Sequence, residues 1–215
     1  MLPEAFNIGR PYRRADQGCN YGPGVLKQLL ALSNAFNVTF VAGLIVRRLG
    51  MREWPPLSAA YLISDRTRCT VMCYKGWPDN SDNYTPCTRT CDVMNPLLCN
   101  GHWIGAIICR DLDDTERCVA LQNRFEALDQ SRTCCRFFCV PGHMYRYYFG
   151  AGAMGNDAQL RPESTNTVTI MANSDPEGCK SFITNSGGKI ISPVPDEYRK
   201  ANRIILEPLG KLHAA

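Results

Sequence analysis

Apolar residues recur at helical spacing in two stretches of the chain. The first runs from Pro23, a residue that suits the first turn of a helix, to about Ser33. The second runs from Asp114 to Gln130, behind an acidic, threonine-containing start that is typical of a helix N-terminus. We therefore predict two helices, one near the start of the chain and one near its middle.

Elsewhere the pattern is that of β-strands. Nine segments are short, apolar and partly β-branched, and turn-forming residues separate them. These segments are Phe36 to Arg47, Ala60 to Ser64, Cys69 to Lys75, Trp103 to Arg110, Arg136 to Val140, Met144 to Phe149, Thr167 to Ala172, Lys189 to Ile191 and Arg203 to Leu206. Many short strands with few helices predict a mainly β fold of the α+β class, namely an antiparallel β-sandwich with an N-terminal arm and helix and one further helix.

The first 22 residues show no hydrophobic periodicity and contain scattered prolines and glycines. We predict an N-terminal arm and helix over residues 1–34 and a single β-rich domain over residues 35–215, with no linker between separate domains. Because the arm from Met1 to Tyr21 lacks the pattern to form its own core, we expect it to pack mainly on neighbouring copies of the protein.

Composition narrows the list of partners. The chain has 215 residues, of which 45% are hydrophobic, and its net charge is only +4. A small, dispersed charge argues against nucleic acid, and no apolar stretch approaches the roughly 18 residues that span a bilayer. Arginines number 18 against six lysines, beside nine tyrosines. Either the coding sequence is biased in base composition, or this surface is built to be buried by copies or partners.

Twelve cysteines stand beside an N-terminus, residues 1–14, that lacks the apolar core of an export signal. The thiols could bind metal, the chain could be a mature fragment of an exported protein, or a cytosolic thiol protein could oxidise after release. Zinc could be bound by the twin pair Cys69-x3-Cys73 and Cys87-x3-Cys91, by Cys99-x2-His102 or by Cys135-x3-Cys139-x3-His143. Most gaps between cysteines are three residues, which favours disulfides and buried thiols, and we predict no metal site. The disulfide candidates are Cys69, Cys73, Cys87, Cys91, Cys134, Cys135 and Cys139.

Two further motifs bear on chemistry. Gly150 to Gly155 reads GxGxxG, but Pro162 breaks the segment that would form the following helix, so we predict a loop without a dinucleotide cofactor. Cys139 and His143 form the one nucleophile and base pair found in the sequence, and no third residue is visible to orient them. We therefore predict no catalytic residue and no cofactor.

Val194-Pro195-Asp196-Glu197-Tyr198, after the predicted strand from Lys189 to Ile191, resembles a pentapeptide of the cypovirus polyhedrins. The resemblance implies a protein with an N-terminal helix on a β-sandwich that crystallises inside infected cells and embeds virions. It also implies that a nucleotide could lie between subunits, and it assigns no functional residue in this chain.

The sequence thus favours a non-enzymatic structural protein that self-assembles into an ordered lattice, the matrix of a viral occlusion body. Its predicted partners are copies of itself in a homo-oligomer or lattice and virus particles. Its predicted location is the host cell cytoplasm, with later release inside occlusion bodies. The alternative is a secreted, disulfide-stapled binding domain. The third hypothesis is a cysteine- or zinc-dependent enzyme.

Overall fold

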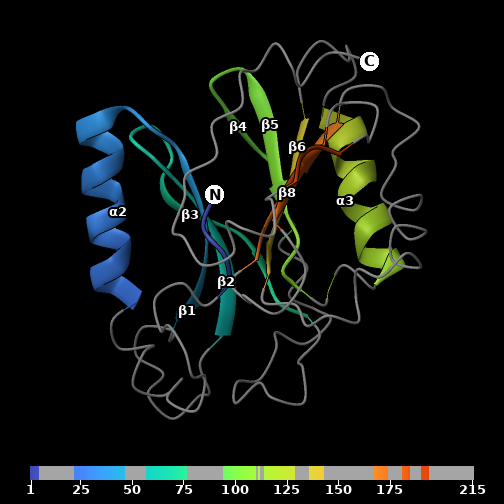
Figure 1. Ribbon diagram of the computed structural model, residues 1–215, viewed down its shortest axis with the longest axis horizontal. Helices are drawn as coiled ribbons and strands as arrows, with labels where there is room; N and C mark the ends of the chain where they lie inside the picture. The colour runs from blue at the N-terminus through green and yellow to red at the C-terminus, as the bar shows by residue number, and fades with distance from the viewer. Residues whose placement is uncertain are drawn as a thin grey trace.

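The computed structural model describes residues 1–4, 22–46, 57–76, 94–109, 111, 114–128, 136–142, 167–173, 181–184 and 190–193. The elements in these ranges are α2 (Gly22–Phe36), β1 (Phe40–Val46), β2 (Leu57–Ser64), β3 (Arg68–Tyr74), β4 (Leu97–Cys99), β5 (His102–Ala106), α3 (Thr115–Leu128), β6 (Arg136–Gly142), β7 (Thr167–Asn173), β8 (Phe182–Thr184) and β9 (Ile190–Pro193). They form four layers, in the order α2, a three-stranded sheet, a six-stranded sheet and α3 (Figure 1).

The three-stranded sheet has the order β1-β2-β3, and both pairings are antiparallel. Every residue of the central strand β2 is buried, because α2 covers one face of the sheet and the six-stranded sheet covers the other. Its side chains alternate between two cores. Ile63 packs in the core under α2 together with Leu29, whereas Leu62 packs in the core between the sheets. Because both faces of β2 are buried, the strand is apolar at almost every position instead of alternating between apolar and polar residues.

The six-stranded sheet has the order β4-β5-β6-β7-β8-β9 and is mixed. The β5–β6 and β6–β7 pairs are parallel, and the β4–β5, β7–β8 and β8–β9 pairs are antiparallel. Parallel neighbours need a crossover connection, and α3 supplies it between β5 and β6. It lies so close to β5 that a Cβ on Gly105 would come within 2.7 Å of the Phe125 ring.

The prediction of an antiparallel β-sandwich is therefore wrong. One sheet is mixed, and each sheet carries a helix on its outer face. Both predicted helices are confirmed, although α2 extends three residues beyond Ser33. Strands β4 and β8 were not predicted, because each spans three residues. The predicted strands at 144–149 and 203–206 lie outside the described residues. Neither α2 nor α3 is long and apolar enough to cross a membrane.

The first four residues of the chain pack on this molecule's own sheet, so the expectation that the arm packs on neighbouring copies does not describe these four residues. The Leu2 N–H donates to the Val41 carbonyl oxygen at 2.7 Å, and Leu2 forms a parallel bridge with Ala42. The side chain of Glu4 is only 2% exposed. Residues 5–21 of the predicted arm lie outside the described part of the chain. The first four residues thus belong to the folded core.

Candidate active site

A buried ion pair lies beside the three-stranded sheet. Glu4 Oε1 and Lys75 Nζ are 3.0 Å apart, and each side chain is 2% exposed. Ser58 holds both partners: its hydroxyl donates to Glu4 Oε1 at 3.1 Å, and its carbonyl oxygen accepts the Lys75 N–H at 2.9 Å. Burying two charges is costly unless they are paired and hydrogen-bonded, as they are here. The pair is therefore fixed in place by the fold.

Gly43 of β1 explains how Glu4 reaches this position. A Cβ at Gly43 would lie 2.7 Å from the Glu4 Cα and 2.8 Å from the Pro141 Cβ. Both are closer than real Cβ atoms approach their neighbours, so only glycine permits this contact. The first residues of the chain therefore lie directly on the middle of β1, next to the end of β6.

A cysteine occupies the turn that leads from β5 to α3. Cys109 follows the buried residues Ile107 and Ile108, is 5% exposed and has a φ of 49°. This left-handed conformation is uncommon for a residue that is not glycine. Strained backbone at a strand-to-helix turn is one way in which enzymes present a nucleophile. The geometry at Cys109 therefore identifies it as a candidate nucleophile.

Backbone hydrogen bonds define this turn. The Asp111 N–H donates to the Ile108 carbonyl oxygen at 3.0 Å, and the Asp114 N–H donates to the Asp111 carbonyl oxygen at 3.1 Å. Asp114 then caps α3, because its Oδ1 accepts the backbone N–H groups of Glu116 and Arg117 at 3.1 and 3.3 Å. The sequence Asp114-Thr115-Glu116 thus begins the helix immediately after the cysteine turn.

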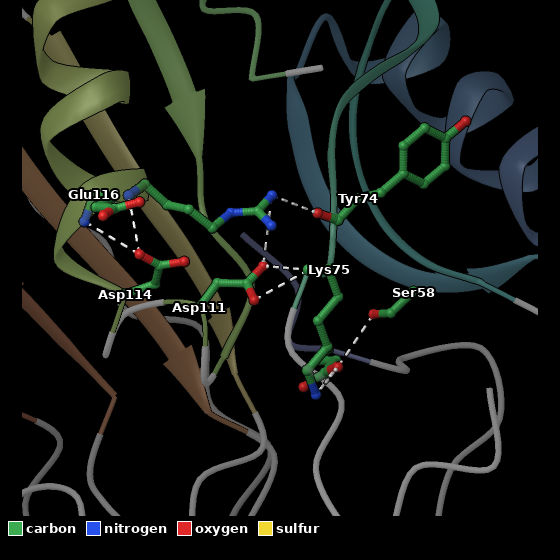
Figure 2. A network of polar contacts seen from close by, with 9 residues as sticks. Ser58, Tyr74, Lys75, Asp111, Asp114 and Glu116 are labelled. Atoms are coloured by element: carbon green, nitrogen blue, oxygen red, sulfur yellow. Dashed lines mark hydrogen bonds and ion pairs between the residues drawn. The ribbon is translucent and has the colours of Figure 1, made fainter. Parts of the chain in front are cut away.

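Asp111 connects the cysteine turn to the lysine segment. Its two carboxylate oxygens accept the Gly76 N–H at 3.1 and 2.9 Å (Figure 2). Gly76 follows Lys75 directly, and Asp111 lies two residues after Cys109. One hydrogen-bonded contact therefore joins the segments that carry Lys75 and Cys109. Through the ion pair, Glu4 belongs to the same group of residues.

Two other buried cysteines have the properties of structural thiols. Burial raises the pKa of the Cys139 thiol to about 12. Burial also raises the pKa of Cys73, with a further contribution from the nearby negative charge of Asp111. Such thiols stay protonated at neutral pH, and a protonated thiol is a poor nucleophile. Cys139, the nucleophile considered from the sequence, lies within β6, and its suggested partner His143 lies outside the described residues.

Three of the seven disulfide candidates lie within the described residues. Cys69, Cys73 and Cys139 have free thiols. Cys69 packs toward α2 and Cys73 packs between the sheets, on the opposite face. Residues four apart on a regular strand share a face, but the pairing of β2 with β3 shifts register between Ala60 and Tyr61, which leaves Met72 as an extra residue. Cys87, Cys91, Cys134 and Cys135 lie outside the described residues.

The other motifs of the sequence lie only partly within the described residues. The described residues include no cluster of three or more His, Cys, Asp or Glu side chains that could hold a metal ion. Within the described part of the chain, His102 packs its ring edge-on against Phe137, with ring centres 5.5 Å apart. The segments 150–155 and 194–198 lie outside the described residues. The residues that the sequence interpretation missed are Glu4, Lys75 and Cys109.

Several solved structures share this architecture. A cysteine-to-alanine mutant of the amidase from Nesterenkonia AN1, of the nitrilase superfamily, matches with a TM-score of 0.64 and 15% identity over 90% of this chain and 72% of its own. A carbon-nitrogen hydrolase from Helicobacter pylori G27 matches with a TM-score of 0.65 and 14% identity over 91% and 73%. A glutamate-to-glutamine mutant of the Nesterenkonia amidase, in which acrylamide has added to the active-site cysteine, matches with a TM-score of 0.62 and 15% identity over 94% and 82%.

No protein-family model matches the sequence, and no curated protein matches it either. At identities of 14–15%, the structural matches show a shared fold. They nevertheless overturn the polyhedrin resemblance, because the similar structures are a nitrilase-superfamily amidase and a carbon-nitrogen hydrolase, and each covers nine-tenths or more of this chain. The prediction of a non-enzymatic lattice protein of a viral occlusion body is wrong for the same reason. The five residues at 194–198 were too short a string to identify a family.

Proposed function

We propose that this protein is a cysteine-dependent hydrolase that cleaves the carbon–nitrogen bond of an amide, with Cys109 as its nucleophile. The observation that carries the proposal is the position of Cys109 on a left-handed turn that Asp111 joins to the buried Lys75–Glu4 pair. A nucleophile, a carboxylate that can act as its base and a cation that can stabilise an oxyanion together suffice for acyl transfer.

The sequence spacing supports the choice of residues. In the Nesterenkonia amidase the replaced glutamate and the replaced cysteine carry the numbers 41 and 145, so they are 104 positions apart (145 minus 41). Glu4 and Cys109 are 105 positions apart (109 minus 4). A shared fold with nearly equal spacing favours the same two roles in this chain.

The first half of the proposed reaction forms a thioester. The Glu4 carboxylate takes the thiol proton of Cys109, and the sulfur attacks the amide carbonyl carbon to form a C–S bond. The carbonyl oxygen becomes an oxyanion, which the Lys75 ammonium stabilises because a fixed charge in a buried site acts strongly on developing charge. The oxyanion then collapses, the C–N bond breaks, and the leaving amine takes the proton held by Glu4.

The second half regenerates the enzyme. Water attacks the thioester carbon while Glu4 accepts a proton from that water. Lys75 again stabilises the oxyanion. The C–S bond then breaks, the carboxylic acid leaves, and Cys109 recovers its proton. Glu4 therefore acts as base and then as acid in each half, and the atoms balance as amide plus water giving acid plus amine.

Ammonia release from short aliphatic amides, such as butyramide, tests the proposal. Wild-type protein should release ammonia, and Cys109→Ala should release none. Cys69→Ser is the matched control, because Cys69 packs on the far face of β3 toward α2 and donates to the Leu26 carbonyl oxygen. Acrylamide should add to the peptide that contains Cys109, as mass spectrometry would show. Hydrolysis that survives in Cys109→Ala would refute the proposal.

A further inference from the structure

Lys75 is held from both sides by residues that take no part in the proposed reaction. The Gly76 N–H, on one side, donates to both carboxylate oxygens of Asp111. The Tyr74 carbonyl oxygen, on the other side, accepts a hydrogen bond from Arg117 Nη2 at 3.1 Å. Arg117 Nη2 lies 3.9 Å from Asp111 Oδ2 (Figure 2). The backbone on each side of Lys75 is therefore held by this one pair of charged side chains.

Asp111 also holds the cysteine turn. Its backbone N–H donates to Ile108, the residue before Cys109, and its carbonyl oxygen accepts from Asp114 at the start of α3. Its side chain is 1% exposed, so its carboxylate is shielded from water. A displacement of Asp111 would therefore change the position of Cys109 and the position of Lys75 together.

Arg117 fixes Asp111 from the first turn of α3. It is 14% exposed, and its guanidinium lies over Gly76. A Cβ at Gly76 would overlap Arg117 Nη1 and would lie 2.6 Å from its Cζ. Glycine at position 76 is what allows the guanidinium to reach both Tyr74 and Asp111.

We propose that Asp111 and Arg117 are positioning residues that set the placement of the Lys75 ammonium relative to the Cys109 sulfur. The inference rests on the proposed function of Cys109 and extends it to two residues that need not touch the substrate. Small errors in placement are costly, because a shift of about 1 Å can lower a rate by about 100-fold. The placement affects the chemical step more than substrate binding, so kcat should change and KM should not.

The experiment compares Asp111→Ala and Arg117→Ala with two controls on the same helix. Arg124→Ala removes an exposed hydrogen bond to Asn95, and Glu126→Ala changes another exposed residue of α3. Two readouts are taken: kcat and KM for butyramide, and the rate at which iodoacetamide labels Cys109, followed by peptide mass spectrometry. We expect about a 100-fold loss of kcat at nearly constant KM in the first pair, slower labelling of Cys109, and neither effect in the controls.

The conservative variants keep the test decisive if an alanine variant fails to fold. Asp111→Asn retains one acceptor oxygen for Gly76, and Arg117→Lys retains the charge, so both should show partial losses in the same direction. If the wild type hydrolyses no amide but Cys109 is labelled more slowly in Asp111→Ala and Arg117→Ala than in the wild type, the result would support positioning while refuting the proposed function. Wild-type kcat and labelling in Asp111→Ala, or equal losses in Arg124→Ala, would overturn the positioning role.

Discussion

Glu4 and Lys75 are 71 residues apart in the sequence, yet their side chains form an ion pair of 3.0 Å that is almost completely buried. A pair of apolar residues would serve stability as well or better, because the cost of removing two charges from water can exceed their attraction. Retaining the pair is therefore easier to explain by chemistry than by stability.

Removing one partner of this pair should be far more harmful than removing both. Lys75→Met leaves the Glu4 carboxylate buried without its cation, which should lower the free energy of unfolding by about 3–5 kcal/mol. The double variant Glu4→Gln/Lys75→Met should lose much less than the sum of the single losses. Urea unfolding of Lys75→Met, Glu4→Gln and the double variant measures this, and additive losses would contradict it. All three should be inactive.

Ser58→Ala tests the residue that holds both charges. The variant loses the hydroxyl bond to the Glu4 carboxylate, which should lower the free energy of unfolding by about 1.5–3 kcal/mol and also lower kcat. Ser64→Ala is the matched control on the same strand, because the Ser64 hydroxyl contacts Thr67 in a turn. The control should lose some stability and keep its kcat. Equal kcat values in the two variants would show that Ser58 does not position Glu4.

The sequence predicted the elements better than their arrangement. Both helices and the strands that became β1, β2 and β3 follow from local patterns. The order of strand, helix and strand over residues 103–140 is also a pattern for parallel pairing, but it was interpreted as part of an antiparallel sandwich. Local periodicity does not show which distant strands pair with one another. The mixed sheet could therefore be recognised only from the structure.

The site was missed for a similar reason. Glu4 lies in a segment without hydrophobic periodicity, and Lys75 is a polar residue directly after β3, as is common at the end of a strand. Only the fold brings them together. Cys109 did carry a sequence signal, because it ends a buried apolar run and the residue that caps the next helix, Asp114, follows five positions later. With twelve cysteines in the chain, the sequence pattern favoured disulfide pairing and did not single out Cys109.

Alanine at Gly76 should be harmful, whereas alanine at Gly24 should not. In Gly76→Ala the new methyl group overlaps Arg117 and must displace its guanidinium from Tyr74 and Asp111. At Gly24, within α2, nothing lies within 4 Å of a new Cβ. Gly24→Ala should therefore raise the free energy of unfolding by up to about 1 kcal/mol. Urea unfolding and butyramide kinetics compare them, and wild-type kcat in Gly76→Ala would argue against the positioning of Lys75.

Alkaline pH should destabilise the fold through its buried thiols and tyrosine. Burial raises the pKa of Cys139 from 9.0 to about 12, and burial with the nearby Tyr74 and Cys69 raises the pKa of Tyr61 from 10.0 to about 12. Below pH 9 the Cys139 thiol is protonated in both states, so its contribution is constant. Above pH 9 the unfolded chain releases this proton while the folded chain keeps it. The free energy of unfolding must therefore fall as pH rises toward 12.

Cys139→Ala isolates this effect. The variant leaves a small cavity and should be less stable at every pH, but it has no thiol to ionise at position 139. A fully ionised group contributes up to about 1.4 kcal/mol per pH unit, so between pH 8 and 10.5 the wild type should lose about 2 kcal/mol more than the variant, nearly all of it above pH 9. Urea unfolding at pH 8, 9 and 10.5 provides the comparison. Tyr61→Phe should show the same pH dependence as the wild type up to pH 10, because Tyr61 begins to ionise in the unfolded chain only near that pH. Parallel curves for the wild type and Cys139→Ala would show that the thiol ionises as readily in the folded protein as in the unfolded chain.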